Sequence, residues 1–184
     1  MNEEMKDRTD DEEDGGREAL IARDERFVVL LRHGIAEEHS AGKADEDRTL
    51  TTEGHAKMKQ IARGLAQILP RVQSIYSSPL VRCVQTGLWV TKGYRKKVAL
   101  ATHPSLRPDG EPGAVIEFAR GLPDRRLILI GHEPNLSRTM AAWIGLEEPG
   151  RFELKKGGCY GIRISPRGAL LEWVLSPRIL RRVQ

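Results

Sequence analysis

The sequence predicts an α/β fold, a three-layer αβα sandwich around a largely parallel central sheet with an antiparallel edge. Short continuous apolar runs alternate along the chain with segments whose apolar residues recur at helical spacing. Two of these runs, 27–31 and 127–130, lack the polar alternation of a half-buried strand, as is typical of parallel strands covered on both faces. Two further strand candidates surround a Ser-Pro-Arg-Gly turn near the end of the chain and predict the antiparallel edge.

Local signals set the order of the elements. Thr51 is a typical N-cap with an acid in the following turn, and Pro70 ends the helix that begins there. Pro79 suits the first turn of another helix. The expected elements are a strand at 27–31, a charged loop at 37–48, a helix at 52–69, a strand at 72–76, a helix from 79 to about 93, a short strand at 98–101, a proline-rich loop at 103–113, a helix around 115–119, a strand at 125–130, a helix at 134–144, a turn at 145–150, and strands at 158–164 and 169–175.

The length of 184 residues predicts one domain, at 26–184. Residues 1–25 are expected to form a disordered acidic tail, with at most a short helix at 18–26, because like charges cluster there and large apolar side chains are nearly absent. No apolar run approaches the roughly 18 residues that a membrane span needs. With no secretory signal at its start, the protein is expected to be cytoplasmic.

Charge is unevenly distributed along the chain. Residues 1–18 contain nine acids and three bases, a net charge of −6, so the formal total of +4 leaves the remainder at +10. A positive body suits an anionic substrate. Nucleic acid is not the expected partner, since the basic residues are not interleaved with aromatic ones. Cys83 and Cys159 are expected to be reduced, buried thiols.

Polar residues that could take part in catalysis or ligand binding lie at the ends of these elements. Arg32 and His33 follow one buried strand, His132 follows another, and Arg82 lies near the start of a helix. Ligands bind at the carboxyl edge of such sheets, so these four residues are expected to converge there. Guanidinium groups match phosphoryl oxygens bidentately, so the set predicts a phosphoryl pocket. Nearby positive charge is expected to lower the pKa of His33 and keep it a neutral nucleophile, while His132 donates to the phosphoryl oxygens.

The same residues resemble the motifs of a known family. Leu31-Arg32-His33-Gly34, Leu50-Thr51-Thr52-Glu53-Gly54, the Ser77–Thr86 segment around Arg82, and Gly131-His132-Glu133-Pro134 are similar, in order, to the motifs of the histidine phosphatase (phosphoglycerate mutase-like) superfamily. Gln85-Thr86 and the residues after His132 look most like its SixA branch of phosphohistidine phosphatases. The resemblance spans about Phe27 to Leu175 and implies a phosphoglycerate mutase-like fold.

The resemblance implies roles for individual residues. His33 would accept the phosphoryl group, with Arg32, Arg82 and His132 completing its pocket, and neither a metal nor another cofactor is implied. Ser78 and Thr51 are more often helix caps, yet either could contact phosphate. The chain departs from the family pattern at Ile35, where the SixA branch often has a charged residue, and in having no convincing general acid. Two carboxylates are candidates for that acid, Glu111 and Glu133.

The lack of a convincing general acid affects which substrate is expected. An alkoxide leaving group needs a proton during bond breaking, whereas a phosphohistidine can leave as imidazole once its nitrogen is protonated, even by solvent. The expected function is therefore removal of phosphate from phosphohistidine in a signalling or phosphotransfer protein. A phosphatase of a small phosphate ester or sugar phosphate is the alternative within enzymes, and a non-catalytic phosphate-binding module is the alternative outside them.

The remaining histidines, tryptophans and terminal arginines are expected to have no catalytic role. His39 lies in the charged loop, His55 on a helical face and His103 before a proline, from which it could still line the pocket. The tryptophans at 89, 143 and 173 are expected to pack in the interior, and the basic end at 178–182 to be solvated.

Overall fold

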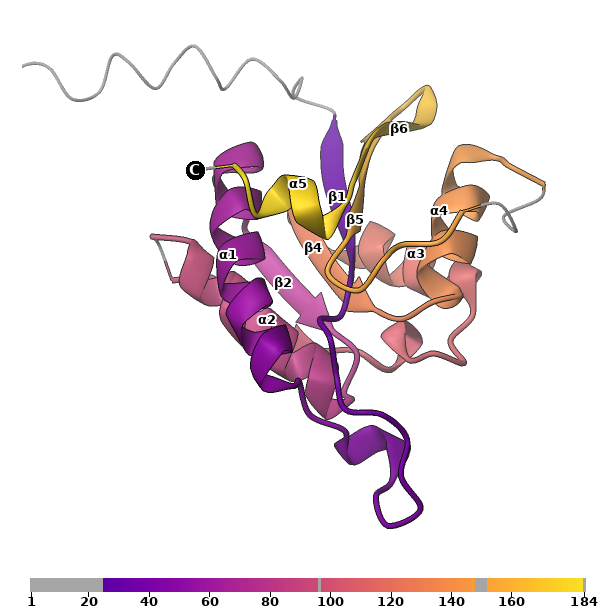
Figure 1. Ribbon diagram of the computed structural model, residues 1–184. Helices are drawn as coiled ribbons and strands as arrows, with labels where there is room; N and C mark the ends of the chain where they lie inside the picture. Colours follow the sequence, from indigo (N-terminus) through magenta and orange to yellow (C-terminus); the bar gives the residue numbers. More distant parts are fainter. Residues whose placement is uncertain (1–24, 96, 148–151, 184) are drawn as a thin grey trace, which may run out of the picture.

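The computed structural model describes residues 25–95, 97–147 and 152–183 (Figure 1). The expected acidic tail and the short helix at 18–26 lie almost entirely outside these ranges, as does the second half of the turn at 145–150. Within the described ranges, no helix combines the length and apolar character needed to cross a membrane. The helices and strands are β1 (Arg26–Arg32), α1 (Thr52–Ile68), β2 (Ser74–Ser77), α2 (Val81–Gly93), β3 (Ala99–Thr102), α3 (Pro112–Gly121), β4 (Arg126–Gly131), α4 (Asn135–Ile144), β5 (Cys159–Ser165), β6 (Gly168–Leu175) and α5 (Pro177–Leu180), with short 3-10 helices η2 (Asp45–Asp47) and η3 (Pro104–Leu106).

The six strands form one sheet in the order β3-β2-β4-β1-β5-β6. Strands β3, β2, β4 and β1 are parallel, and β5 and β6 add the expected antiparallel edge. Strand β1 lies between β4 and β5 and pairs with β4 in a register that sets Arg32 opposite Gly131. The carboxyl ends of β1 and β4 therefore meet at the same edge of the sheet.

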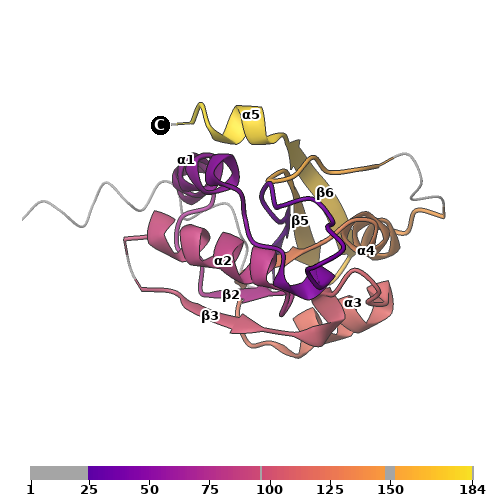
Figure 2. The ribbon, with the colours of Figure 1, turned by 60° about the horizontal axis from the view of Figure 1, so that its bottom comes forward.

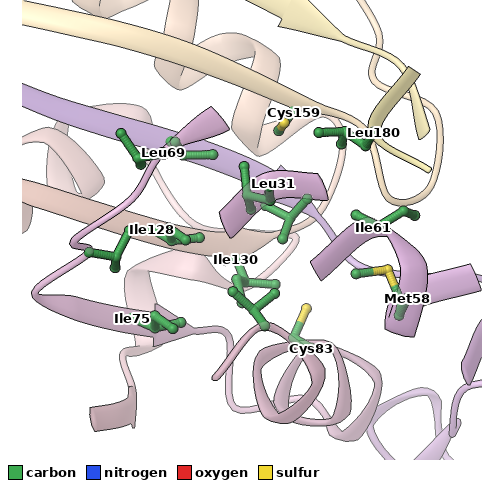
Figure 3. Close-up of a cluster of buried hydrophobic side chains, with 14 of the residues drawn as sticks. Leu31, Met58, Ile61, Leu69, Ile75, Cys83, Ile128, Ile130, Cys159 and Leu180 are labelled. Carbon is green, nitrogen blue, oxygen red and sulfur yellow. The ribbon is translucent and has the colours of Figure 1, made fainter. Parts of the chain in front are cut away.

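Helices cover both faces of the sheet, which confirms the three-layer sandwich. Successive residues of a strand point to opposite faces, so Val29 and Leu31 belong to one buried cluster while Val28 and Leu30 belong to another. The first cluster is completed by side chains from α1, α2 and α5, and Figure 3 shows Leu31 among them. The second cluster is completed by side chains from α3 and α4. The sheet is thus buried on both faces, as the continuous apolar runs predicted.

Helix α2 begins later than the sequence indicates. Leu80 is its N-cap and has an extended backbone (φ −64°, ψ 137°), so Pro79 precedes the helix rather than forming its first turn. Ser78 N–H instead donates to Ile130 O at 2.8 Å, which ties this segment to the end of β4. As a result Arg82 is the second residue of α2 and lies beside the tip of β4. Expected strand boundaries elsewhere differ from those observed by one or two residues.

The end of the chain is more ordered than expected. Ser176 accepts a hydrogen bond from Ile179 N–H and starts helix α5, whose Leu180 is fully buried in the cluster under α1. A Cβ atom at Gly64 of α1 would lie 1.9 Å from Leu180 O, so only glycine permits this close approach. The expectation of a solvated basic end is confirmed for the exposed Arg178 and Arg182, whereas Arg181 is half-buried.

Two adjacent residues of α5 provide a test of this packing. Leu180→Ala is expected to lower the free energy of unfolding by about 2–4 kcal/mol, because a buried leucine loses its contacts and leaves a cavity. Ile179→Ala should cost less than about 0.5 kcal/mol, since the Ile179 side chain is 49% exposed. Urea denaturation of both variants measures the difference, and equal losses would show that α5 does not pack on α1.

Candidate active site

Two histidines lie side by side at the carboxyl edge of the sheet. His33 follows β1 and His132 follows β4, and His33 N–H donates to Gly131 O at 3.1 Å. The centroids of the two imidazole rings are 5.0 Å apart, and both side chains are almost completely buried. The structure therefore brings together the two histidines that the sequence placed at strand ends.

Contacts around His33 fix its orientation. Its Nδ1 lies 2.7 Å from Gly34 O, and since a carbonyl only accepts, Nδ1 carries the proton and Nε2 keeps its lone pair. Gly34 N–H in turn donates to Thr86 Oγ1, which donates to Arg82 O. A Cβ atom at Gly34 would lie 2.6 Å from Met58 Cγ, so the glycine lets the backbone pack closely against α1. Gly34 O is thus the backbone partner of the second ring nitrogen of His33.

Burial makes His33 neutral. It is the largest cause that lowers the pKa of His33 to about 3, with smaller contributions from the charges of Arg82 and Arg32. The sequence predicted the direction of this shift correctly, but it attributed the shift to the arginines alone. Desolvation disfavours the imidazolium form whatever charges lie nearby. His33 is therefore a neutral imidazole throughout the neutral and mildly acidic range.

His132 is held by three neighbours. Its Nε2 lies 3.0 Å from Ser78 Oγ and 3.3 Å from Cys83 Sγ, and its Nδ1 lies 3.4 Å from Arg82 Nη2. A guanidinium only donates, so Nδ1 accepts and the proton resides on Nε2. Burial, followed by the charges of His33 and Arg82, lowers the pKa of His132 to about 2. Ser78, a candidate phosphate contact, thus lies against His132, as does the reduced, buried Cys83 that sequence reasoning assigned only to the interior.

Each of the two arginines has a buried Nε donor without a partner among the described residues. Arg82 donates from Nη1 to Asp45 O and from Nη2 to Asp45 Oδ2, at 2.6 and 2.9 Å. Arg32 donates from Nη1 to Glu153 Oε1 at 3.1 Å and to Leu154 O. The Nε atoms of both arginines are buried and have no hydrogen-bond partner among the described residues. An unpaired buried donor is costly, so each of these Nε atoms is a candidate donor to a bound anion.

Sequence reasoning missed Asp45. This residue lies in η2, within the charged loop, and its other carboxylate oxygen accepts from Arg48 Nε at 2.8 Å and lies 3.2 Å from His39 Nε2. Burial opposes ionisation of Asp45, but its hydrogen bond and ion pair with Arg82 and the charge of Arg48 lower its pKa overall. Five acids lie between 37 and 48, and no local signal distinguishes the one that reaches Arg82.

The remaining candidates are not in contact with the four central residues. Glu133 accepts hydrogen bonds from Ser137 N–H, Ser137 Oγ and Leu154 N–H. Glu111 is exposed at the start of α3, and Thr51 Oγ1 caps α1 by accepting from Gly54 N–H. Within the described part of the chain, neither glutamate forms a hydrogen bond or ion pair with His33, His132, Arg32 or Arg82.

The other histidines have partners of their own. His103 stacks on Phe118 with ring centroids 3.6 Å apart, and His55 accepts from Trp89 Nε1 at 2.9 Å. His103 therefore packs beside α3. Among the described residues, no group of three or more His, Cys, Asp or Glu side chains is arranged to hold a metal ion.

The buried histidines predict a specific dependence of stability on pH. Both native pKa values lie below the unfolded value of about 6.5, so the unfolded state binds more protons as the pH falls below it. Each histidine then removes about 1.4 kcal/mol of stability per pH unit between roughly pH 5.5 and 4.5. His33→Asn and His132→Asn should each reduce the slope by that amount in urea denaturation. Unchanged slopes in this range would contradict buried, neutral histidines, and the slopes above pH 7.5 serve as the control.

Comparisons with known proteins agree with this geometry. The sequence profile of the histidine phosphatase superfamily (branch 1) matches residues 28–107, which include His33 and both arginines. An uncharacterized protein of Picosynechococcus sp. is 33% identical over 143 residues, a match that covers 74% of this chain and 84% of the relative. The chain belongs to the histidine phosphatase superfamily. As a member of this superfamily it is a phosphatase, and its substrates are phosphorylated compounds.

Solved structures of histidine phosphatases have the same fold. The protein histidine phosphatase SixA complexed with tungstate matches with a TM-score of 0.74 and 23% identity, over 83% of this chain and 97% of that chain. A putative phosphohistidine phosphatase SixA from Agrobacterium tumefaciens matches with a TM-score of 0.71 and 24% identity, over 83% and 98% of the two chains. A putative alpha-ribazole-5'-P phosphatase from Escherichia coli matches with a TM-score of 0.66 and 16% identity, over 83% of this chain and 97% of that chain. The expected phosphoglycerate mutase-like fold is confirmed.

Proposed function

We propose that this histidine phosphatase uses His33 as its nucleophile and removes phosphate from phosphohistidine in a signalling or phosphotransfer protein. The unpaired, buried Nε atoms of Arg32 and Arg82 beside the two histidines are the observation that carries the proposal. A phosphoryl group bound there would accept from both arginines. His132, in the same cluster, would donate from Nε2 to a phosphoryl oxygen in place of its contact with Ser78 as negative charge develops there.

The reaction follows from the protonation state of His33. The lone pair on Nε2 attacks phosphorus, the phosphorus–nitrogen bond of the substrate breaks, and its electron pair stays on the departing imidazole, which takes a proton from water. Water then attacks the phosphohistidine formed at His33. The new bond to Nε2 breaks, the electron pair returns to His33, and inorganic phosphate leaves. No step requires His33 to release a proton, which agrees with the neutral state that burial imposes on it.

The carboxylates around the site favour a phosphoramidate substrate. Asp45 is bound to Arg82 and Arg48, and Glu133 is bound to Ser137 and Leu154, so both act as hydrogen-bond acceptors for protein groups. The lowered pKa of Asp45 makes this carboxyl a weak proton donor. An ester oxygen needs such a donor when it leaves, whereas a protonated imidazole does not.

A comparison of substrates tests this preference. The specificity constant kcat/KM for a phosphohistidine-containing protein should exceed those for phosphoserine, a sugar phosphate and p-nitrophenyl phosphate by at least about 10²-fold. Release of inorganic phosphate, measured at one enzyme concentration, gives all four values. A larger constant for a small ester would favour that alternative, which has support from the fold shared with a phosphoserine phosphatase of Entamoeba histolytica. Phosphate binding without turnover would indicate a non-catalytic module instead.

A further inference from the structure

A pocket of about 500 Å³ opens beside the phosphoryl site and shares Arg32 with it. Its lining contains five bases and a single acid, Glu153, which already accepts from Arg32. The lining residues are Arg32, Ile35, Lys57, Glu153, Lys155, Lys156, Pro177 and Arg181, and we refer to this site as the basic pocket. None of the four bases other than Arg32 has a part in the chemistry derived above.

One wall of the basic pocket is a turn fixed to the nucleophile's strand. Gly157 N–H donates to Arg32 O and His33 O, both at 3.1 Å, and Arg32 N–H donates to Gly158 O at 3.0 Å. Lys155 and Lys156 extend from this turn into solvent, and neither forms an ion pair among the described residues. The charge of Lys156 is also one of the causes that lower the pKa of His33, so Lys156 interacts electrostatically with the imidazole of His33. These two lysines are held at a fixed position relative to the phosphoryl site.

The opposite wall comes from α1 and α5, which lie side by side (Figure 2). Lys57 of α1 pairs with Glu53 on the same helix, and Arg181 follows α5 and donates from Nε to Pro177 O at 3.2 Å. The burial of Leu180 against α1 holds this wall in place. The basic pocket thus has two fixed walls, and no acid in the described part of the chain pairs with the lysines of the first wall.

We propose that the basic pocket is a second anion subsite, which binds acidic side chains that flank the phosphorylated residue of a protein substrate. The inference rests on the proposed function and deepens it, because it specifies the protein surface on which the phosphohistidine resides. A phosphoryl group at Arg32 lies at the rim of the basic pocket, so residues attached to the same substrate segment meet Lys155 and Lys156. Carboxylates there would supply the counter-charge that Lys155 and Lys156 do not receive from the described residues, and electrostatic complementarity of this kind selects partners and accelerates encounter.

Binding of labelled peptides tests the subsite without requiring turnover. Two fluorescent, unphosphorylated peptides would differ only in whether the residues beside the histidine are Asp and Glu or Asn and Gln, and anisotropy would give each Kd. The wild-type protein should bind the acidic peptide about tenfold more tightly at low salt, a preference that shrinks as salt screens the charges. In Lys155→Gln/Lys156→Gln the ratio of the two Kd values should fall close to one.

A matched control removes the same net charge elsewhere. Lys59 and Lys97 are exposed and line no part of the basic pocket, so Lys59→Gln/Lys97→Gln should keep the wild-type ratio. An unchanged ratio in Lys155→Gln/Lys156→Gln, or an equal fall in both double variants, overturns the subsite. The outcome is separable from that of the proposed function. If the acidic peptide is preferred but phosphohistidine is not hydrolysed, the subsite stands and the phosphohistidine assignment falls.

Discussion

His33→Ala is expected to reduce the kcat/KM of phosphate release by on the order of 10⁴-fold, because it removes the proposed nucleophile. No other described residue offers an unprotonated imidazole next to both arginines, since His132 directs Nε2 at Ser78 and Nδ1 at Arg82. The loss should appear with p-nitrophenyl phosphate as well as with a phosphohistidine protein. Rapid-quench experiments with radiolabelled substrate should trap phosphate on the wild-type protein and none on the variant.

His103→Ala is the matched control for this prediction. Its imidazole stacks on Phe118, outside the cluster of His33 and His132, so turnover should stay within about threefold of the wild-type value. Circular dichroism would confirm that both variants are folded. If His33→Ala keeps substantial turnover, or if a phosphoenzyme still forms on it, His33 is not the nucleophile.

The parts of the site that lie at strand ends could be predicted from the sequence. Buried parallel strands have an unmistakable apolar pattern, and a polar residue directly after such a strand must emerge at the carboxyl edge of the sheet. His33 and His132 are of this kind, and the parallel pairing of β1 with β4 makes them neighbours. The three layers follow from the same pattern, since strands that are apolar on both faces need helices on both sides.

The parts that depend on long-range contacts could not be predicted. Asp45 reaches Arg82 only because the charged loop folds back over α2, and the sequence shows just a run of acids there. Helix α5 is too short to show periodicity, and its order comes from the burial of Leu180 against α1. The main cause of the lowered pKa of His33 was missed for the same reason, because burial is a property of the packed structure whereas nearby arginines can be read from the sequence.

Arg82 variants should show the second largest loss of activity. Arg82 is 2% exposed, and it binds Asp45 through Nη1 and Nη2 while its Nε remains available. Asp45 therefore fixes the guanidinium and leaves its Nε edge for the phosphoryl oxygens of the proposed reaction. Arg82→Ala should lower kcat/KM by about 10²–10³-fold, the usual cost of removing a donor that stabilises developing charge. Steady-state kinetics with p-nitrophenyl phosphate and inhibition by inorganic phosphate measure the loss.

Arg82→Lys tests whether activity needs only the positive charge of Arg82 or also the planar geometry of its guanidinium group. An ammonium group keeps the positive charge but cannot hold Asp45 and present a further donor in one plane, so the variant should recover no more than about tenfold of the activity lost in Arg82→Ala. Arg138→Ala, an exposed arginine on α4, should behave like the wild-type protein. Full activity in Arg82→Lys would mean that only the charge matters. The orphaned Nε would then have no role in catalysis, and phosphate binding would rest on Arg32 and the two histidines.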